Sequence, residues 1–219
     1  MISHLLLDLD GTLINSSPGI YKSFVLACDR FSLLSPSYAQ FCPLIGPPVQ
    51  QIAQQLYPSL DLVSLEEFRG VFRDDYDNTS FRMADWYPEV RDTLNILSAN
   101  FGISISIVTN KPTRPAFDLV ASEGLTSCFS RIVGIDFLAA HSAGPVFSSK
   151  VNALSYVLFS ASFEVAKSVY VGDTPSDQAA CDCCSLPFIA ALYGFHRWNQ
   201  MQMPTLCIES FSEILSLMN

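Results

Sequence analysis

The sequence predicts an α/β fold in which a doubly wound parallel sheet core carries an inserted α-helical cap domain. Short apolar runs of strand length alternate with segments of helical periodicity over most of the chain, a pattern typical of parallel βαβ units. A section with helical periodicity and no strand signal interrupts this alternation after the first strand. Hydrophobic residues make up 49% of the 219 residues and charged residues only 15%, which favours a compact core.

The predicted core comprises residues 1–14 and 84–219. Its first strand begins at His4 and leads directly into Asp8. The later core elements are predicted in this order: helix 88–100, strand 103–108, helix 114–123, strand 132–134, helix 151–159, strand 168–171, helix 176–184, strand 188–191, and a last strand and helix at the C-terminus. Because strands alternate with helices, we expect a Rossmann-like sheet covered on both faces.

The predicted cap comprises residues 15–83. Ser16 precedes an early proline, Pro18, and the apolar period of residues 20–31, so we expect a helix with Ser16 as its capping residue. Several prolines then divide the chain into short helices. Residues 65–76 have an amphipathic helical period with charged side chains on the outer face.

Composition limits the partners and the compartment. The net charge of −9 and the pI near 4.6 disfavour binding to nucleic acid, which depends on clustered Lys and Arg. No uncharged apolar run is long enough to span a bilayer, and no basic, apolar leader is visible, so we expect a cytoplasmic protein without membrane contact. The seven cysteines, including the Cys181, Cys183 and Cys184 cluster, favour free thiols. We expect a monomer or a homodimer.

Two carboxylates follow the first predicted strand. The apolar run ends at Asp8, Asp10 lies two residues later, and Gly11 and Thr12 turn the chain. Residues two apart on a strand project to the same side, so both carboxylates can converge on one ligand. In an open α/β sheet, ligands bind at the carboxyl ends of the strands.

Three further polar groups follow later strands or open later helices. Thr109, Asn110 and Lys111 end the strand 103–108 and offer a hydroxyl, an amide and backbone N–H groups that suit an anion. Acidic Asp173 and Asp177 follow the strand 168–171 and suit a divalent cation with oxygen ligands.

A lysine completes the predicted set. Lys150 opens a predicted helix, where it can offset the repulsion between the carboxylates and contact a phosphate. Each group alone also has a plain structural reading, as a turn, a surface charge or a helix cap. Their order and their common place at strand ends favour one active site.

In these residues the chain resembles the haloacid dehalogenase superfamily, specifically the phosphoglycolate phosphatase-like branch with a small helical cap. Residues 8–13 look like the first motif of the family and residues 172–177 like the fourth. Thr109 with Asn110 looks like the second motif, and Lys150 like the third. The resemblance covers nearly the whole chain.

The resemblance implies a phosphatase with an aspartyl-phosphate intermediate. Asp8 would be the nucleophile, and Asp10 would protonate the leaving group and then deprotonate water. Thr109, the Asn110 backbone and Lys150 would bind the phosphoryl oxygens.

The same resemblance implies Mg²⁺ as the cofactor. Asp8, the backbone carbonyl of Asp10 and Asp173 would hold the ion, with Asp177 close to it. The substrate would be a small phosphorylated metabolite, such as phosphoglycolate, a nucleoside monophosphate, pyrophosphate or a sugar phosphate. A non-catalytic binding module on the same fold is the alternative from another class. A dehalogenase is disfavoured, because its chemistry does not need a second aspartate such as Asp10.

Substrate choice is expected to depend on the cap, because the core residues contact only the phosphoryl group and the metal. The cap segment 44–48 combines Gly46, where a backbone can approach a ligand closely, with two prolines that stiffen the loop. We therefore expect Gly46 to contribute to substrate binding.

Overall fold

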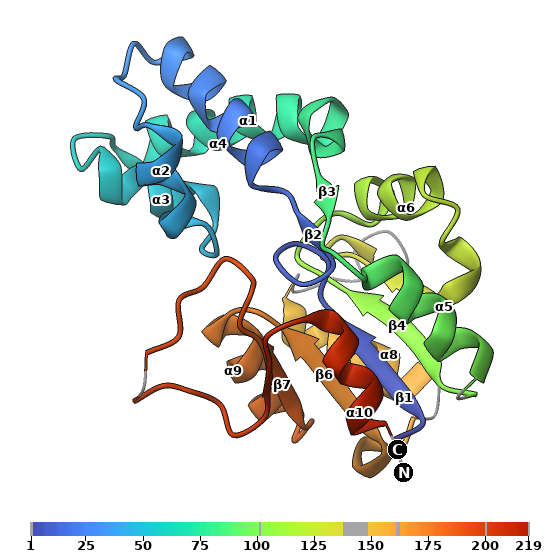
Figure 1. The fold of residues 1–219 in the computed structure, drawn as a ribbon. Coiled ribbons are helices and arrows are strands. Elements are labelled where there is room, and N and C mark those ends of the chain that lie inside the picture. The colour runs from blue at the N-terminus through green and yellow to red at the C-terminus, as the bar shows by residue number, and fades with distance from the viewer. Residues whose placement is uncertain (1, 101, 138–148, 161–162, 200, 219) are drawn as a thin grey trace. The chain divides into compact units, whose positions relative to one another are not determined.

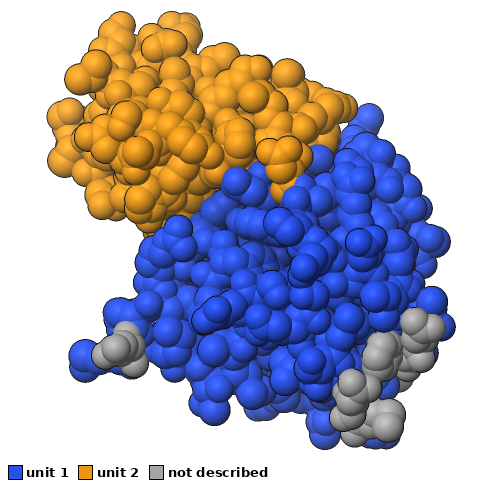
Figure 2. Space-filling model, in the orientation of Figure 1, with its two compact units in different colours: residues 1–15, 86–219 blue, residues 16–85 orange. Residues whose placement is uncertain are grey.

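The computed structural model describes residues 2–100, 102–137, 149–160, 163–199 and 201–218. The chain forms two compact units, one made of residues 1–15 and 86–219 and the other of residues 16–85. Figure 2 draws the first unit in blue and the second in orange.

The first unit is built on a six-stranded sheet in the order β5-β4-β1-β6-β7-β8 (Figure 1). Every neighbouring pair of these strands is parallel. The strands are β1 (His4–Leu7), β4 (Ser104–Val108), β5 (Arg131–Val133), β6 (Ser168–Gly172), β7 (Phe188–Ala191) and β8 (Cys207–Ile208). This sheet confirms the predicted α/β class.

The register of the central strands decides where the functional residues lie. Leu7 of β1 lies opposite Ile107 of β4 on one side and Val171 of β6 on the other. The residues that follow these three strands therefore emerge together at one edge of the sheet. Since β1 is flanked by β4 and β6, that edge gathers residues from sequence positions more than 160 residues apart.

Helices cover both faces of the sheet (Figure 1). On one face, apolar residues of α8 and α9 pack with Leu6 and Tyr170 into a buried core. On the other face lie α5 and α10. The elements of the first unit outside the six-stranded sheet are α5 (Val90–Asn100), α6 (Thr113–Ser122), η3 (Thr126–Cys128), α8 (Lys150–Ser160), η4 (Val165–Lys167), α9 (Pro175–Cys183), η5 (Phe211–Glu213) and α10 (Ile214–Leu217).

Tyr170 connects this core to the edge of the sheet where β1, β4 and β6 end. Its ring is fully buried, and its hydroxyl donates a 2.8 Å hydrogen bond to the carbonyl oxygen of Val108. Because β1 separates β6 from β4, the side chain reaches past one strand to the end of the next. The ring also lies 5.6 Å from the ammonium nitrogen of Lys150, within the range of a cation–π contact.

The second unit is helical and has an aromatic core. Phe24 of α1 packs against Phe41 and Phe68, with ring centroids 4.5 and 5.2 Å away. All three rings are buried. The elements of this unit are α1 (Ser17–Arg30), α2 (Tyr38–Phe41), η1 (Cys42–Leu44), α3 (Val49–Leu56), α4 (Leu62–Asn78) and η2 (Ser80–Arg82). Where the chain passes between the units, β2 (Ile14–Asn15) and β3 (Asp85–Trp86) pair as a two-stranded sheet.

One local prediction is wrong in its chemistry. Ser16 does occupy the N-cap position of α1, but its side chain makes no capping hydrogen bond. Its buried hydroxyl oxygen has no hydrogen-bond partner within the described part of the chain. The helix begins instead with Pro18 in its first turn, whose restricted φ favours a helix start.

Two other expectations concern the cysteines and the membrane. All seven cysteines are free, as their number and spacing predict. Within the described residues, no helix combines the length and the apolar character needed to cross a bilayer.

Candidate active site

Asp8 is the first residue after β1 and is almost completely buried. Its backbone N–H donates to the carbonyl oxygen of Val171, 2.9 Å away, which continues the pairing with β6. Its Oδ1 accepts a 2.8 Å hydrogen bond from the N–H of Leu9, and its Oδ2 accepts one of 2.8 Å from the ammonium of Lys150. Both carboxylate oxygens are therefore oriented by the protein.

Asp177 lies in the first turn of α9, where it forms a reciprocal cap with Thr174. Asp177 Oδ2 accepts hydrogen bonds from the backbone N–H of Thr174 at 3.0 Å and from its hydroxyl at 2.7 Å. Thr174 Oγ1 in turn accepts the N–H of Asp177 at 3.2 Å. The other oxygen, Asp177 Oδ1, accepts a hydrogen bond from Lys150. The reading of this segment as a helix cap is thus confirmed. Its functional role stays a prediction.

Asp173 is held without any positive partner among the described residues. Its Oδ2 accepts a 2.8 Å hydrogen bond from the N–H of Phe195, in the loop after β7, whereas its buried Oδ1 has no hydrogen-bond partner. A Cβ atom at Gly11 or at Gly194 would collide with its carboxylate. Gly11 also has a φ of 81°, a conformation that favours glycine. The two glycines leave room for this carboxylate and confine it.

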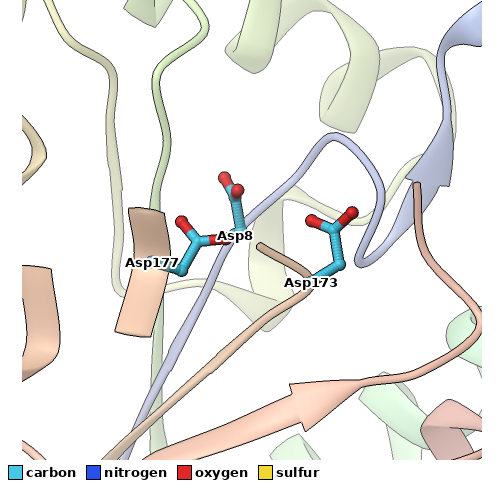
Figure 3. Close-up of side chains that lie close together, drawn as sticks. All are labelled: Asp8, Asp173 and Asp177. Carbon is cyan, nitrogen blue, oxygen red and sulfur yellow. The ribbon is translucent and has the colours of Figure 1, made fainter. Parts of the chain in front are cut away.

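The three carboxylates of Asp8, Asp173 and Asp177 form one cluster. An oxygen from each lies within 4.8 Å of the others, and all three residues are buried. Figure 3 shows the three side chains pointing to the same side, where β1 and β6 end. The geometry brings together the residues that the sequence analysis placed at these two strand ends.

Burial and mutual repulsion control the ionisation of the cluster. Burial raises the pKa of Asp8 to about 6; the charge of Lys150 opposes this, and the charge of Asp177 adds to it. Burial also raises the pKa of Asp173 well above its ordinary value, with a further contribution from Asp177 and Asp8. For Lys150, burial disfavours the charged form, but the charges of Asp177 and Asp8 outweigh burial and raise its pKa.

The remaining predicted residues lie at the end of β4. Thr109 is buried, and its Oγ1 accepts a 3.2 Å hydrogen bond from the backbone N–H of Lys111. Asn110 is exposed. The side chain of Lys111 is buried and forms an ion pair with Asp10, with Nζ 2.9 Å from Oδ1 and 3.3 Å from Oδ2.

Two features of this site were missed by sequence reasoning. The sequence pattern predicts no role for the Lys111 side chain and none for Gly194 or Phe195. A signal existed for both, since Lys111 directly follows Thr109 and Asn110, and Gly194 lies three residues past the predicted strand 188–191. Which side chains they contact could not be deduced from that spacing.

The charges at this edge fit a divalent cation. Asp10 forms an ion pair with Lys111, and Asp8 and Asp177 form ion pairs with Lys150. Asp173 adds a fourth carboxylate to these two ammonium groups. The buried Oδ1 of Asp173, which has no hydrogen-bond partner in the described part of the chain, adds an acceptor that needs a donor or a cation. Carboxylate oxygens are the ligands that hard cations such as Mg²⁺ prefer.

Gly46 is an exposed residue of the second unit, in the connection between η1 and α3. Its φ of 143° lies in the range that L side chains rarely adopt. The expectation that Gly46 contributes to substrate binding stays a prediction.

The chain was compared with known families and proteins. The sequence profile of the family described as haloacid dehalogenase-like hydrolase matches residues 5–191. A phosphoglycolate phosphatase from Aliivibrio fischeri is 25% identical over 97% of this chain and 94% of its own length. One from Pseudomonas fluorescens is 28% identical over 96% of this chain and 78% of its own length.

Solved structures share the fold. A predicted phosphatase from Clostridium acetobutylicum superimposes with a TM-score of 0.86 at 22% identity, over 99% of this chain and 98% of that one. A structure of the Mycobacterium tuberculosis Protein Tyrosine Kinase A reaches a TM-score of 0.82 at 22% identity, over 100% and 98%. Since similar folds carry such different names, the fold alone does not decide the activity.

We predict that the metal-free protein becomes less stable as pH rises from about 4 through 6. The unfolded chain releases the Asp8 proton near pH 4, whereas the folded protein retains it up to about pH 6, so acid favours the folded state. The titration of Asp8 should lower the free energy of unfolding by about 3 kcal/mol over the whole pH range. Added Mg²⁺ is expected to restore stability above pH 6, because a cation that binds only the folded state stabilises it.

Urea unfolding near pH 4 and near pH 8, with chelator or with Mg²⁺, measures most of this effect, and Asp8→Asn is the control. His4 and His196 have lowered pKa values because of burial, so they add an opposite trend that both proteins share. The difference between wild type and Asp8→Asn reports the titration of Asp8 together with its effect on Asp173 and Lys150. Equal pH dependence in the two proteins would contradict the assignment of a buried, repelled charge at this position.

Proposed function

Because this chain belongs to the haloacid dehalogenase-like hydrolases, we propose that it is a Mg²⁺-dependent phosphatase acting on a small phosphorylated metabolite through an aspartyl-phosphate intermediate. The observation that carries the proposal is the buried cluster of Asp8, Asp173 and Asp177 around Lys150 at the ends of β1 and β6. Curated relatives named phosphoglycolate phosphatase, about 25% identical over nearly the whole chain, support a phosphate ester as the substrate.

Asp8 is proposed as the nucleophile. Its Oδ2 lies against Lys150 and its Oδ1 against the N–H of Leu9, so the carboxylate is oriented before a substrate arrives. Attack on phosphorus would form an acyl phosphate and release the alcohol, and water would then hydrolyse that acyl phosphate. Covalent catalysis of this kind divides a difficult hydrolysis into two easier steps.

Asp10 is proposed as the general acid and base. It would protonate the leaving oxygen in the first step and accept a proton from water in the second. Its side chain is 22% exposed, whereas that of Asp8 is 9% exposed, so it is the more accessible of the two carboxylates. A group that exchanges protons with both an alcohol and water needs that access.

The cation would be held by the carboxylates of Asp8 and Asp173 and by the backbone carbonyl of Asp10. Asp177, already bonded to Lys150 and Thr174, would lie close to the ion without having to bind it directly. A bound Mg²⁺ would offset the repulsion between the carboxylates and an anionic phosphate. Thr109, the backbone N–H of Asn110 and Lys150 would bind the phosphoryl oxygens, on which negative charge is spread in the transition state.

The residues named above do not distinguish one phosphate ester from another. A phosphoglycolate phosphatase, a nucleotidase, a pyrophosphatase and a sugar-phosphate phosphatase would all use the residues named above, since these contact only the phosphoryl group and the metal. The burial of Asp8, Asp173, Asp177 and Lys150 in one site favours an enzyme over a non-catalytic binding module, because burying these charges is costly.

We expect phosphate release from at least one member of a panel containing 2-phosphoglycolate, nucleoside monophosphates, pyrophosphate, sugar phosphates and p-nitrophenyl phosphate. Release should require Mg²⁺ and should fall to background in Asp8→Asn, because the nearly isosteric amide cannot attack phosphorus. Glu164→Gln is the matched control, since Glu164 forms an exposed ion pair with Lys167. Activity in folded Asp8→Asn, or in chelator-treated wild type, would contradict the proposal.

The choice among these esters is proposed to depend on Gly46 in the cap. Gly46→Val places a branched side chain where the backbone has a φ of 143°, so the connection between η1 and α3 must rearrange. We expect the ranking of the panel substrates to change, while p-nitrophenyl phosphate hydrolysis stays within a few-fold of wild type. If Gly46→Val lowers the rate for every substrate by the same factor, this loop does not select among them.

A further inference from the structure

We propose that Lys111 is a positioning residue that holds the Asp10 carboxylate in the orientation needed for proton transfer. This inference rests on the proposed function. The lysine ammonium contacts both oxygens of Asp10, at 2.9 and 3.3 Å, so it restrains the tilt of the carboxylate as well as its position. A single contact would leave the carboxylate free to rotate about it.

The burial of the pair is asymmetric in a way that suits this role. The side chain of Lys111 is 1% exposed and that of Asp10 is 22% exposed. The lysine therefore contacts the carboxylate from the protein interior, and the carboxylate keeps an accessible side. An exposed ion pair would contribute little order, because solvent screens it and both side chains stay mobile.

The backbone of Lys111 is itself fastened at both of its polar groups. Its N–H donates to Thr109 Oγ1 at 3.2 Å, and its carbonyl oxygen accepts the N–H of Ile135 at 3.2 Å. A Cβ atom at Gly134 would collide with the Lys111 carbonyl oxygen, so this glycine lets the end of β5 lie directly against the turn. The Lys111 side chain thus extends from a backbone whose position is fixed by hydrogen bonds.

Asp136 strengthens the same attachment. Its Oδ1 accepts hydrogen bonds of 2.7 Å from both the N–H and the hydroxyl of Thr113, at the start of α6. Thr113 Oγ1 also accepts the N–H of Gly134 at 3.1 Å. On the other side of the lysine, the N–H of Thr109 donates to the carbonyl oxygen of Val133 at 3.0 Å. The segment that carries Lys111 is therefore bonded to β5 and the residues after it on either side of the lysine.

The two buried lysines contact different carboxylates. Lys150 contacts Asp8 and Asp177, which belong to the nucleophile and metal cluster, whereas Lys111 contacts Asp10. Removal of Lys111 should therefore disturb proton transfer to the leaving group more than attack by Asp8. Proton transfer is sensitive to geometry, because donor and acceptor must lie within hydrogen-bond reach of one another.

The test compares substrates whose leaving groups need a proton to different degrees. In single-turnover phosphoryl transfer at fixed pH, Lys111→Met should slow an alkyl phosphate, 2-phosphoglycolate, at least about tenfold more than p-nitrophenyl phosphate, whose leaving group departs without protonation. In the Asp10→Asn background, Lys111→Met should cause little further loss for 2-phosphoglycolate, because the residue it orients is no longer an acid.

Two further variants complete the design. Lys167→Met removes an exposed lysine paired with Glu164 and should leave both substrates at wild-type rates. Lys111→Arg keeps the positive charge but replaces the ammonium with a planar fork. Lys111→Arg should also slow 2-phosphoglycolate more than p-nitrophenyl phosphate, but by a smaller factor. It serves as the test if thermal melting shows that Lys111→Met is not folded.

The outcomes separate this inference from the proposed function. An equal loss for both substrates, or a full additional loss in the Asp10→Asn background, would overturn the positioning role while leaving the phosphatase intact. No phosphate release by wild type from any phosphate ester would instead overturn the proposed function itself.

Discussion

The structure at the functional edge depends on one constraint: more negative charge is buried there than the protein's own cations neutralise. Lys150 forms ion pairs with two buried carboxylates, Asp8 and Asp177. Within the described ranges, Asp173 accepts a hydrogen bond only from the N–H of Phe195. Removing one partner of a buried ion pair leaves an uncompensated charge, which is among the most destabilising changes in a protein. The site is therefore assembled as a unit, and a divalent cation would complete its charge balance.

The fold supplies the rigidity that this charge arrangement requires. Asp8 directly follows a buried strand between two parallel neighbours, and Asp177 is locked into the cap of α9 by Thr174. Gly11 and Gly194 allow two loops to close on the Asp173 carboxylate. Like charges stay close together only where their positions are held from several directions, and strand ends, a helix cap and tight loops provide those directions.

Much of this arrangement could be predicted from the sequence, because it depends on local patterns. The strand 188–191 is predicted with the bounds that β7 has, and the strands before Asp8, Thr109 and Asp173 end where the polar residues begin. Parallel βαβ units bring such strand ends to one edge, which is why residues 8, 150, 173 and 177 could be grouped in advance.

The contacts that could not be predicted are those set by side-chain packing across the fold. Lys111 and Asp10 are 101 residues apart, and no spacing rule connects them. The contact between Phe195 and Asp173 passes through a backbone N–H, which any residue type carries. For Ser16 the residue type is favourable at an N-cap, but its hydroxyl is buried away from the helix N–H groups. The residue preference at helix starts therefore predicts the N-cap position of Ser16 correctly, but not its capping hydrogen bond.

The central claim is that Asp8 becomes phosphorylated during turnover, and trapping the acyl phosphate tests it most directly. Wild-type protein is mixed with substrate and Mg²⁺, quenched within the first turnovers and treated with borohydride, which reduces an acyl phosphate to an alcohol. Mass spectrometry of the peptides then locates the modified residue. We predict homoserine at position 8 and an unmodified Asp10. Reduction at Asp10, or active turnover without any reduced aspartate, would contradict the account.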